Sequence, residues 1–179
     1  MRAQKWLMVF INLFGGVAVL GSYVHGFLTH PSAAEVLWGG VPQSIRPFYT
    51  AGMFLAAAGY FAFTYFILFR LNPGDTRVYG QFGYGAFNAF YTAILIPSAL
   101  WMPLTFLGVE NSSPALLWTV RLVLAVVGLA SLGLLFALLT VKPGRPSWTA
   151  RLAIVGCAFF CIQTALLDAV IWGSLFRSF

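Results

Sequence analysis

The sequence predicts an all-α fold, an integral membrane bundle of five transmembrane helices. Of its 179 residues, 60% are hydrophobic and 8% are charged, whereas a soluble domain carries about 25% charged residues. The mean hydropathy is +0.88, so we expect lipid to surround most of the surface. Five apolar segments each reach the roughly 20 helical residues that a bilayer core requires. The 18 Phe and six Trp residues are typical of membrane proteins with aromatic anchors.

The predicted helices form a single domain over residues 1–179. They comprise residues 5–27, 48–69, 85–107, 115–141 and 150–176. Transmembrane strands are excluded because the apolar runs are too long and do not alternate. The first run follows Arg2 and Lys5, as in a signal peptide, but it is too long for one and no clear A-x-A site follows. We therefore predict that it is a helix.

The loops between these helices are unequal. The first, 28–47, is the longest and contains Trp38 and several prolines. A long loop with its own aromatic residue is more typical of function than of a minimal connection. The turn signal Asn72-Pro73-Gly74-Asp75 marks the second loop, and the fourth is tight and basic at 142–146.

Basic residues favour one side of the membrane. Seven lie on the side of the N-terminus and the second and fourth loops: Arg2, Lys5, Arg70, Arg77, Lys142, Arg145 and Arg151. The other side carries Arg46 and Arg177. This asymmetry predicts a cytoplasmic N-terminus and an external C-terminus, in a bacterial inner membrane. The net charge of +6 shows no clustering, so no nucleic-acid partner is expected.

Arg121 and Asp168 are ionisable residues inside predicted transmembrane helices, where each costs several kcal/mol unless paired or facing a polar cavity. They lie about equally far from the fourth turn, near Arg145, so their depths should match. Three interpretations stay open. The residues form a structural ion pair, they form the polar floor of a ligand cavity, or Arg121 extends to the headgroups while Asp168 stays protonated.

Trp101 is predicted at a similar depth, between Pro97 and Pro103. It is either an interfacial tryptophan in a bent helix or an aromatic wall opposite the charged residues. His25 is a possible axial ligand of a tetrapyrrole, although an interfacial polar role is simpler; the sequence predicts no other metal site. Cys157 and Cys161 are more simply explained by packing than by reactivity. No hydrolase or transferase motif is visible, so we favour a protein that is not an enzyme.

The segment Leu100-Trp101-Met102-Pro103-Leu104-Thr105-Phe106 resembles the third-helix pattern of the translocator protein family, also called the TspO/MBR or tryptophan-rich sensory family. Five helices and a first loop with a tryptophan and prolines are similar to it as well. Three departures stand out. Ser98 replaces the usual Asn, the fifth helix lacks the Pro-Tyr and Trp of the family around 156–163, and Asp168 stands where we align a later Asn.

This resemblance implies a cavity under the first loop that binds porphyrins, sterols or similar flat hydrophobic molecules, often in a dimer. It implies no enzymatic activity. We therefore expect a membrane-embedded binding protein with its ligand in the outer half, and a tetrapyrrole is a possible cofactor. In this hypothesis Trp38 and Tyr49 cap the cavity, Trp101 stacks on the ligand, and polar orientation comes from Arg121, Gln163 and Asp168.

A second hypothesis from a different class is a non-catalytic accessory subunit of a larger membrane complex, such as a pigment or electron-transfer assembly. Small size, abundant Phe and small residues on helix faces fit it without any cavity. Its partners would be other membrane subunits instead of a hydrophobic small molecule. A transporter is less favoured because no inverted repeat is visible.

Overall fold

The structure, a computed structural model, describes residues 2–142 and 147–176. In these residues five helices are long and apolar enough to cross a membrane, which confirms the all-α class. Each lies within three residues of its predicted ends. Their bounds are α1 Arg2–Thr29, α3 Arg46–Tyr65 continued by η2 Phe66–Arg70, α4 Gly85–Glu110, α5 Pro114–Thr140, and α6 Trp148–Cys161 continued by η3 Ile162–Trp172 and α7 Gly173–Leu175.

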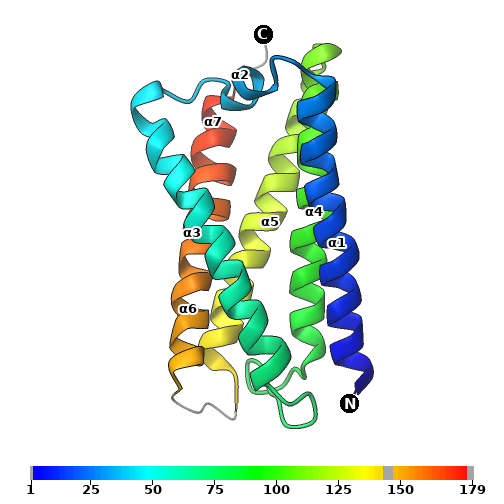
Figure 1. The fold of residues 1–179 in the computed structure, drawn as a ribbon, viewed down its shortest axis with the longest axis vertical. Coiled ribbons are helices and arrows are strands. Elements are labelled where there is room, and N and C mark those ends of the chain that lie inside the picture. Colours follow the sequence, from blue (N-terminus) through cyan, green and yellow to red (C-terminus); the bar gives the residue numbers. More distant parts are fainter. Residues whose placement is uncertain (1, 143–146, 177–179) are drawn as a thin grey trace.

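The helices run up and down so that the two chain ends lie at opposite ends of the bundle (Figure 1). We call the end where α1 begins the N-terminal end. The other is the α2 end, because the short helix α2 Ala33–Trp38 and the 3₁₀ turn η1 Gln43–Ile45 lie there. The predicted long first loop is thus partly helical. Arg145 and Arg177, which contributed to the predicted orientation, lie outside the described residues.

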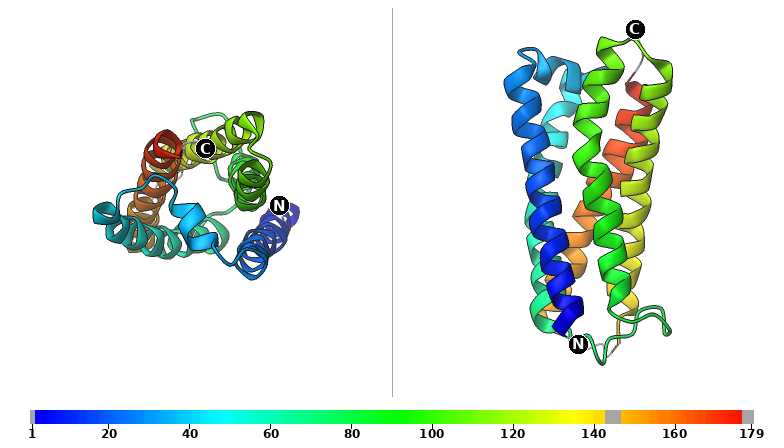
Figure 2. Two further views of the ribbon diagram at one scale, coloured as in Figure 1. Left: turned by 90° about the horizontal axis from the view of Figure 1, so that it is seen from above. Right: turned by 90° about the vertical axis from the view of Figure 1, so that its right-hand side faces the viewer.

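The helices pack in a ring whose order differs from their order in the sequence. α1 packs on α4, α4 on α5, α5 on α6 and η3, and α6 on α3. Seen from above, α2 crosses over the middle of this ring (Figure 2, left). The contact of α3 with α6 is close because Gly59 faces Gly156. A Cβ built on Gly156 would lie 2.7 Å from Gly59 Cα, so small residues allow these backbones to approach.

The N-terminal half contains one continuous core. Its largest fully buried side chains are aromatic and include Phe63, Phe87 and Tyr91. Their polar atoms are paired inside the core: Tyr91 Oη lies 2.7 Å from Thr64 Oγ1. Across the bundle, Tyr60 donates to Asn12 Oδ1 at 2.6 Å and so ties α3 to α1. This half is a packed scaffold.

The core of the α2 half is divided into two clusters. One joins α5, the last helix and the start of α3, and its buried members include Tyr49 and Trp172. The other lies below α2 and consists of Ala33, Met102 and Phe106. Trp101 packs against both clusters. Trp101 is thus the side chain that connects the two clusters of this half.

Candidate functional site

The side chains singled out by the sequence gather at the α2 end. Trp101 on α4 meets two rings edge-on: Tyr23 of α1 at 6.1 Å between centroids and Trp172 of η3 at 5.7 Å. The Trp101 ring is only partly buried, yet its Nε1 is buried and has no hydrogen-bond partner among the described residues. An unpaired buried donor is costly. Trp101 therefore presents both an aromatic wall and an unused N–H donor.

Trp38 and Tyr49, the predicted cap, lie together below the first loop. Their rings are edge-to-face at 6.1 Å, and the Arg46 guanidinium lies 5.2 Å from the Trp38 ring centroid. The Tyr49 hydroxyl donates to the backbone carbonyl of Leu167 at 2.8 Å, so it is already used in holding α3 to the last helix. Tyr49 is thereby a structural support of the cap.

The cover formed by α2 is attached to the last helix by a residue that the sequence analysis missed. Trp172 donates from Nε1 to the carbonyl of Leu37 at 2.7 Å and stacks on Phe176 at 4.3 Å. Beyond α2, Gly39 adopts φ +49, and a Cβ there would meet the Phe176 ring. The chain thus needs glycine at this point to fold α2 down against the end of the bundle.

Asp168 and Gln163 meet because of the local winding of the helix. Gln163 donates from Nε2 to Asp168 Oδ1 at 2.8 Å. Residues five apart do not share a face of an α-helix, but Ile162–Trp172 is a π-helix, in which the backbone bonds join residues five apart. π-Helices are rare and often occur at functional sites. Regular α-helical spacing does not predict this contact.

Gln163 is buried between two helices. Its side chain is 4% exposed, and its Oε1 has no hydrogen-bond partner among the described residues. That oxygen lies against Gly52 of α3, where an added Cβ would meet it. The glycine at position 52 thus leaves room for the Gln163 amide, whose nitrogen donates to Asp168.

The Asp168 carboxylate lies beside the Gln163 amide, on the helix that carries Trp172. The residue keeps partial exposure, and no hydrogen-bond partner of its second oxygen, Oδ2, is found in the part of the chain that the structure describes. We call the group Tyr23, Trp38, Tyr49, Trp101, Gln163, Asp168 and Trp172 the α2-end cluster.

Arg121 does not belong to this cluster, and the predicted ion pair with Asp168 is wrong. The Arg121 guanidinium donates to the carbonyls of Gly173 and Phe176, at 2.9 and 3.0 Å. Its Cζ also lies 4.6 Å from the Trp118 ring centroid. Within residues 2–142 and 147–176, the one ion pair joins His30 Nε2 to Glu110 Oε1 at 2.9 Å.

The register of α5 against the last helix, and the end of that helix, explain the difference. Gly128 of α5 lies against Ala165. Arg121 is seven residues before Gly128, so α-helical spacing places it level with Trp172 and not with Asp168. The last carbonyls of a helix also lack intrahelical partners and attract basic side chains. Arg121 thus caps the end of the last helix.

The two histidines have different surroundings. His25 is exposed on α1, and among the described residues no group of three or more His, Cys, Asp or Glu side chains is placed to hold a metal ion. His30 stacks on Phe106 at 3.9 Å and pairs with Glu110, which links the start of the first loop to the end of α4. In the sequence, the sign of this pair was the acidic residue Glu110 in the short connection after the third predicted helix.

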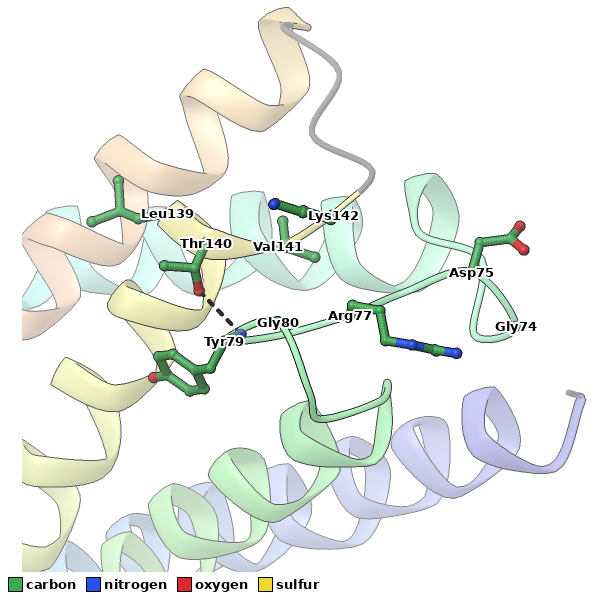
Figure 3. Close-up of a pocket in the computed structure, with 9 residues that line it drawn as sticks. All are labelled: Gly74, Asp75, Arg77, Tyr79, Gly80, Leu139, Thr140, Val141 and Lys142. Atoms are coloured by element: carbon green, nitrogen blue, oxygen red, sulfur yellow. Dashed lines mark hydrogen bonds between the residues drawn. The ribbon is translucent and has the colours of Figure 1, made fainter.

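An open pocket of about 1230 Å³ lies at the opposite, N-terminal end (Figure 3). Reciprocal backbone bonds of 2.9 and 2.8 Å between Arg77 and Lys142 hold the second loop to the end of α5. Tyr79 adopts φ +54, and its hydroxyl donates to the carbonyl of Gly133 at 2.6 Å. Partial burial raises the pKa of Tyr79. None of the predicted ligand-binding residues lines this pocket.

Comparisons with protein families, with curated proteins and with solved structures found no match for this chain. The resemblance to the translocator protein family therefore stays a prediction. The observations that bear on function are those of the chain itself: an integral membrane bundle, a cover over one end, and an acidic, aromatic cluster below it.

Proposed function

We propose that this protein binds a flat, largely apolar molecule between its helices at the α2 end. One observation carries the proposal: Trp101 meets Tyr23 and Trp172 edge-on, so that aromatic rings from three separate helices converge at the α2 end. Ligand sites are mostly apolar and aromatic, with a few placed polar groups. The unpaired Trp101 Nε1 is such a group. The proposed role is binding and not catalysis.

The family resemblance supports the same class of ligand, porphyrins, sterols or similar molecules. Trp101 lies in the segment that resembles the third-helix pattern, and α2 covers the end of the bundle where the resemblance implies a cavity. The last helix differs from that pattern, since its polar residues here are Gln163 and Asp168. Arg121 is left out of the proposed contacts because its guanidinium already donates hydrogen bonds to backbone carbonyls.

Binding is tested by quenching of tryptophan fluorescence with protoporphyrin in detergent micelles. We expect saturable quenching, and weaker binding in Trp101→Phe. Trp118→Phe is the matched control, because Trp118 lies on α5 with 66% of its surface exposed to the surroundings. Quenching that grows linearly and changes equally in both variants would mean partitioning into the micelle, and would overturn the proposal.

We also propose that the α2 end faces the outside of a bacterial inner membrane. The basic residues support this orientation: apart from Arg121 within α5, six of the described ones lie toward the N-terminal end and one, Arg46, toward the α2 end. A C-terminal alkaline phosphatase fusion should be active and a C-terminal fluorescent protein fusion dark. The opposite result would place the α2 end in the cytoplasm.

The accessory-subunit hypothesis has one observation in its favour. Gly16 and Gly21 of α1 each have no neighbour within 4 Å of an added Cβ, and small residues allow another helix to approach closely. Native mass spectrometry from mild detergent distinguishes the two. Retained partner subunits, with saturable porphyrin binding absent, would favour the accessory role.

A further inference from the structure

We infer that the molecule bound at the α2-end cluster carries a protonated nitrogen, which pairs with Asp168. This inference rests on the proposed binding function and adds the charge of the ligand to it. It starts from the correction above: Asp168 lies within a membrane-spanning helix but is not neutralised by Arg121. A carboxylate at that depth requires a partner or a polar cavity.

The protein's own cations near this end have other partners. Arg46 donates from Nε to the carbonyl of Val41 and stands over Trp38. Arg121 binds the carbonyls of the last turn, and His30 pairs with Glu110. His25 is exposed on α1. Among the described residues, therefore, no basic side chain is paired with Asp168.

The neutral groups around Asp168 satisfy only part of its hydrogen-bonding capacity. Gln163 donates one hydrogen bond to Oδ1, and its amide oxygen lies against Gly52. The Tyr49 hydroxyl donates to the carbonyl of Leu167, the residue before Asp168. The second oxygen thus remains available on a side chain that keeps partial exposure. A carboxylate whose position is set and whose second oxygen is free is suited to a charge-assisted bond with an incoming donor.

The aromatic rings favour the same ligand chemistry. Tyr23 and Trp101 lie edge-to-face, as do Trp101 and Trp172, so the ring faces point in different directions. Trp172 lies four residues after Asp168 on the same helix. Aromatic faces attract cations, most strongly when water is excluded, and Trp is the best of them. A flat apolar cation can therefore stack on these rings and place its N–H toward the carboxylate. A ligand with carboxylates would have to direct them away from Asp168.

A matched pair of flat probes tests this inference. 9-Aminoacridine is protonated in mildly alkaline buffer, and acridine of nearly the same shape is neutral. Binding is measured by tryptophan quenching in nanodiscs of zwitterionic lipid, which prevents attraction of the cation to an anionic surface. We expect 9-aminoacridine to bind about tenfold more tightly or better, as for a hydrogen bond to a charged group.

Asp168→Asn keeps the shape of the side chain and removes its charge, so it should abolish this preference while acridine binding changes little. Glu110→Gln is the control, since it removes a carboxylate at the same end that His30 already neutralises. Arg177→Gln tests the remaining basic residue predicted at this end, which lies outside the described residues. If Arg177→Gln raised the affinity for 9-aminoacridine equally in the wild type and in Asp168→Asn, Arg177 would act on the ligand without involving Asp168.

The outcomes separate the inference from the proposed function. Equal saturable binding of both probes, unchanged in Asp168→Asn, would overturn the cation inference and leave the binding function standing. Failure of both probes and of protoporphyrin to saturate would overturn both. If Asp168→Asn does not fold, the comparison of the two probes on the wild-type protein still decides, because a cationic preference below about twofold would contradict the inference.

Discussion

The N-terminal half of the bundle and its α2 half use the same kinds of residues in different ways. In the N-terminal half, Phe63 and Tyr91 belong to one continuous core whose tyrosine hydroxyls find partners. In the α2 half, the core is divided, Trp101 connects its two parts, and Trp101 Nε1 is left unpaired. A fully packed core stabilises the fold, so the difference makes the N-terminal half the main source of stability and the α2 half the place where we propose binding.

The largest effect is expected where the backbones approach most closely. Gly59→Ala places a Cβ against the carbonyl of Gly156, and neither backbone can give way without separating α3 from α6. We expect a loss of about 3 kcal/mol in stability, measured by thermal unfolding in detergent. Gly16→Ala is the matched control, since open space surrounds it. Equal stability of the two variants would show that the crossing is looser than described.

The next comparison sets a side chain of the packed core against Trp101. Phe63→Ala removes a fully buried ring and should cost about 3 kcal/mol through the cavity it leaves. Trp101→Ala removes a larger ring, yet we expect a smaller loss of thermal stability, because that ring is only partly buried and its N–H is unpaired. Ligand affinity should fall in Trp101→Ala and not in Phe63→Ala. The reverse pattern would assign binding to the N-terminal half.

The sequence predicted the fold well because hydropathy over about 20 residues determines where helices cross a membrane. It also singled out Trp38, Tyr49 and Trp101, which lie in or against one cluster, and Gln163 and Asp168, which are joined by a hydrogen bond. Tyr23 and Trp172 were missed because an aromatic residue in an apolar helix has no distinctive local signal. Their importance depends on the ring order of the helices, with α1 beside α4 and η3 beside α5.

The partner of Arg121 could not be predicted for a different reason. Depth was estimated from a turn centre near Arg145, whereas the structure sets Gly128 against Ala165, a register that no local pattern in the sequence reveals. The missed hydrogen bond between Gln163 and Asp168 has a separate cause, the π-helical winding of Ile162–Trp172.

A double-mutant cycle sharpens this correction. Arg121→Leu removes two hydrogen bonds from a charged group to backbone carbonyls, and we expect a loss of about 2 kcal/mol. Asp168→Asn should add its own effect independently, with a coupling energy below about 0.5 kcal/mol. Thermal unfolding of the wild type, both single variants and the double variant measures it. A coupling of about 2 kcal/mol or more would restore the ion pair that the sequence predicted.

The smallest effect is expected at the ion pair between His30 and Glu110, which joins the start of the first loop to α4. The Glu110 side chain is 54% exposed, and exposed ion pairs contribute at most about 1 kcal/mol. Glu110→Gln should therefore lower stability by less than that, and the difference from wild type should shrink as salt is added, because salt screens exposed charges.

His30→Gln separates the ion pair from the stacking of His30 on Phe106. It should lower stability as much as Glu110→Gln only if the ion pair contributes more to stability than the stacked ring does. A greater loss in His30→Gln than in Glu110→Gln, insensitive to salt, would assign the attachment of the first loop to ring stacking. If His30→Gln lowers ligand affinity with little change in stability, the contact of His30 with Glu110 belongs to the cover of the proposed site. The site would then include the end of α4.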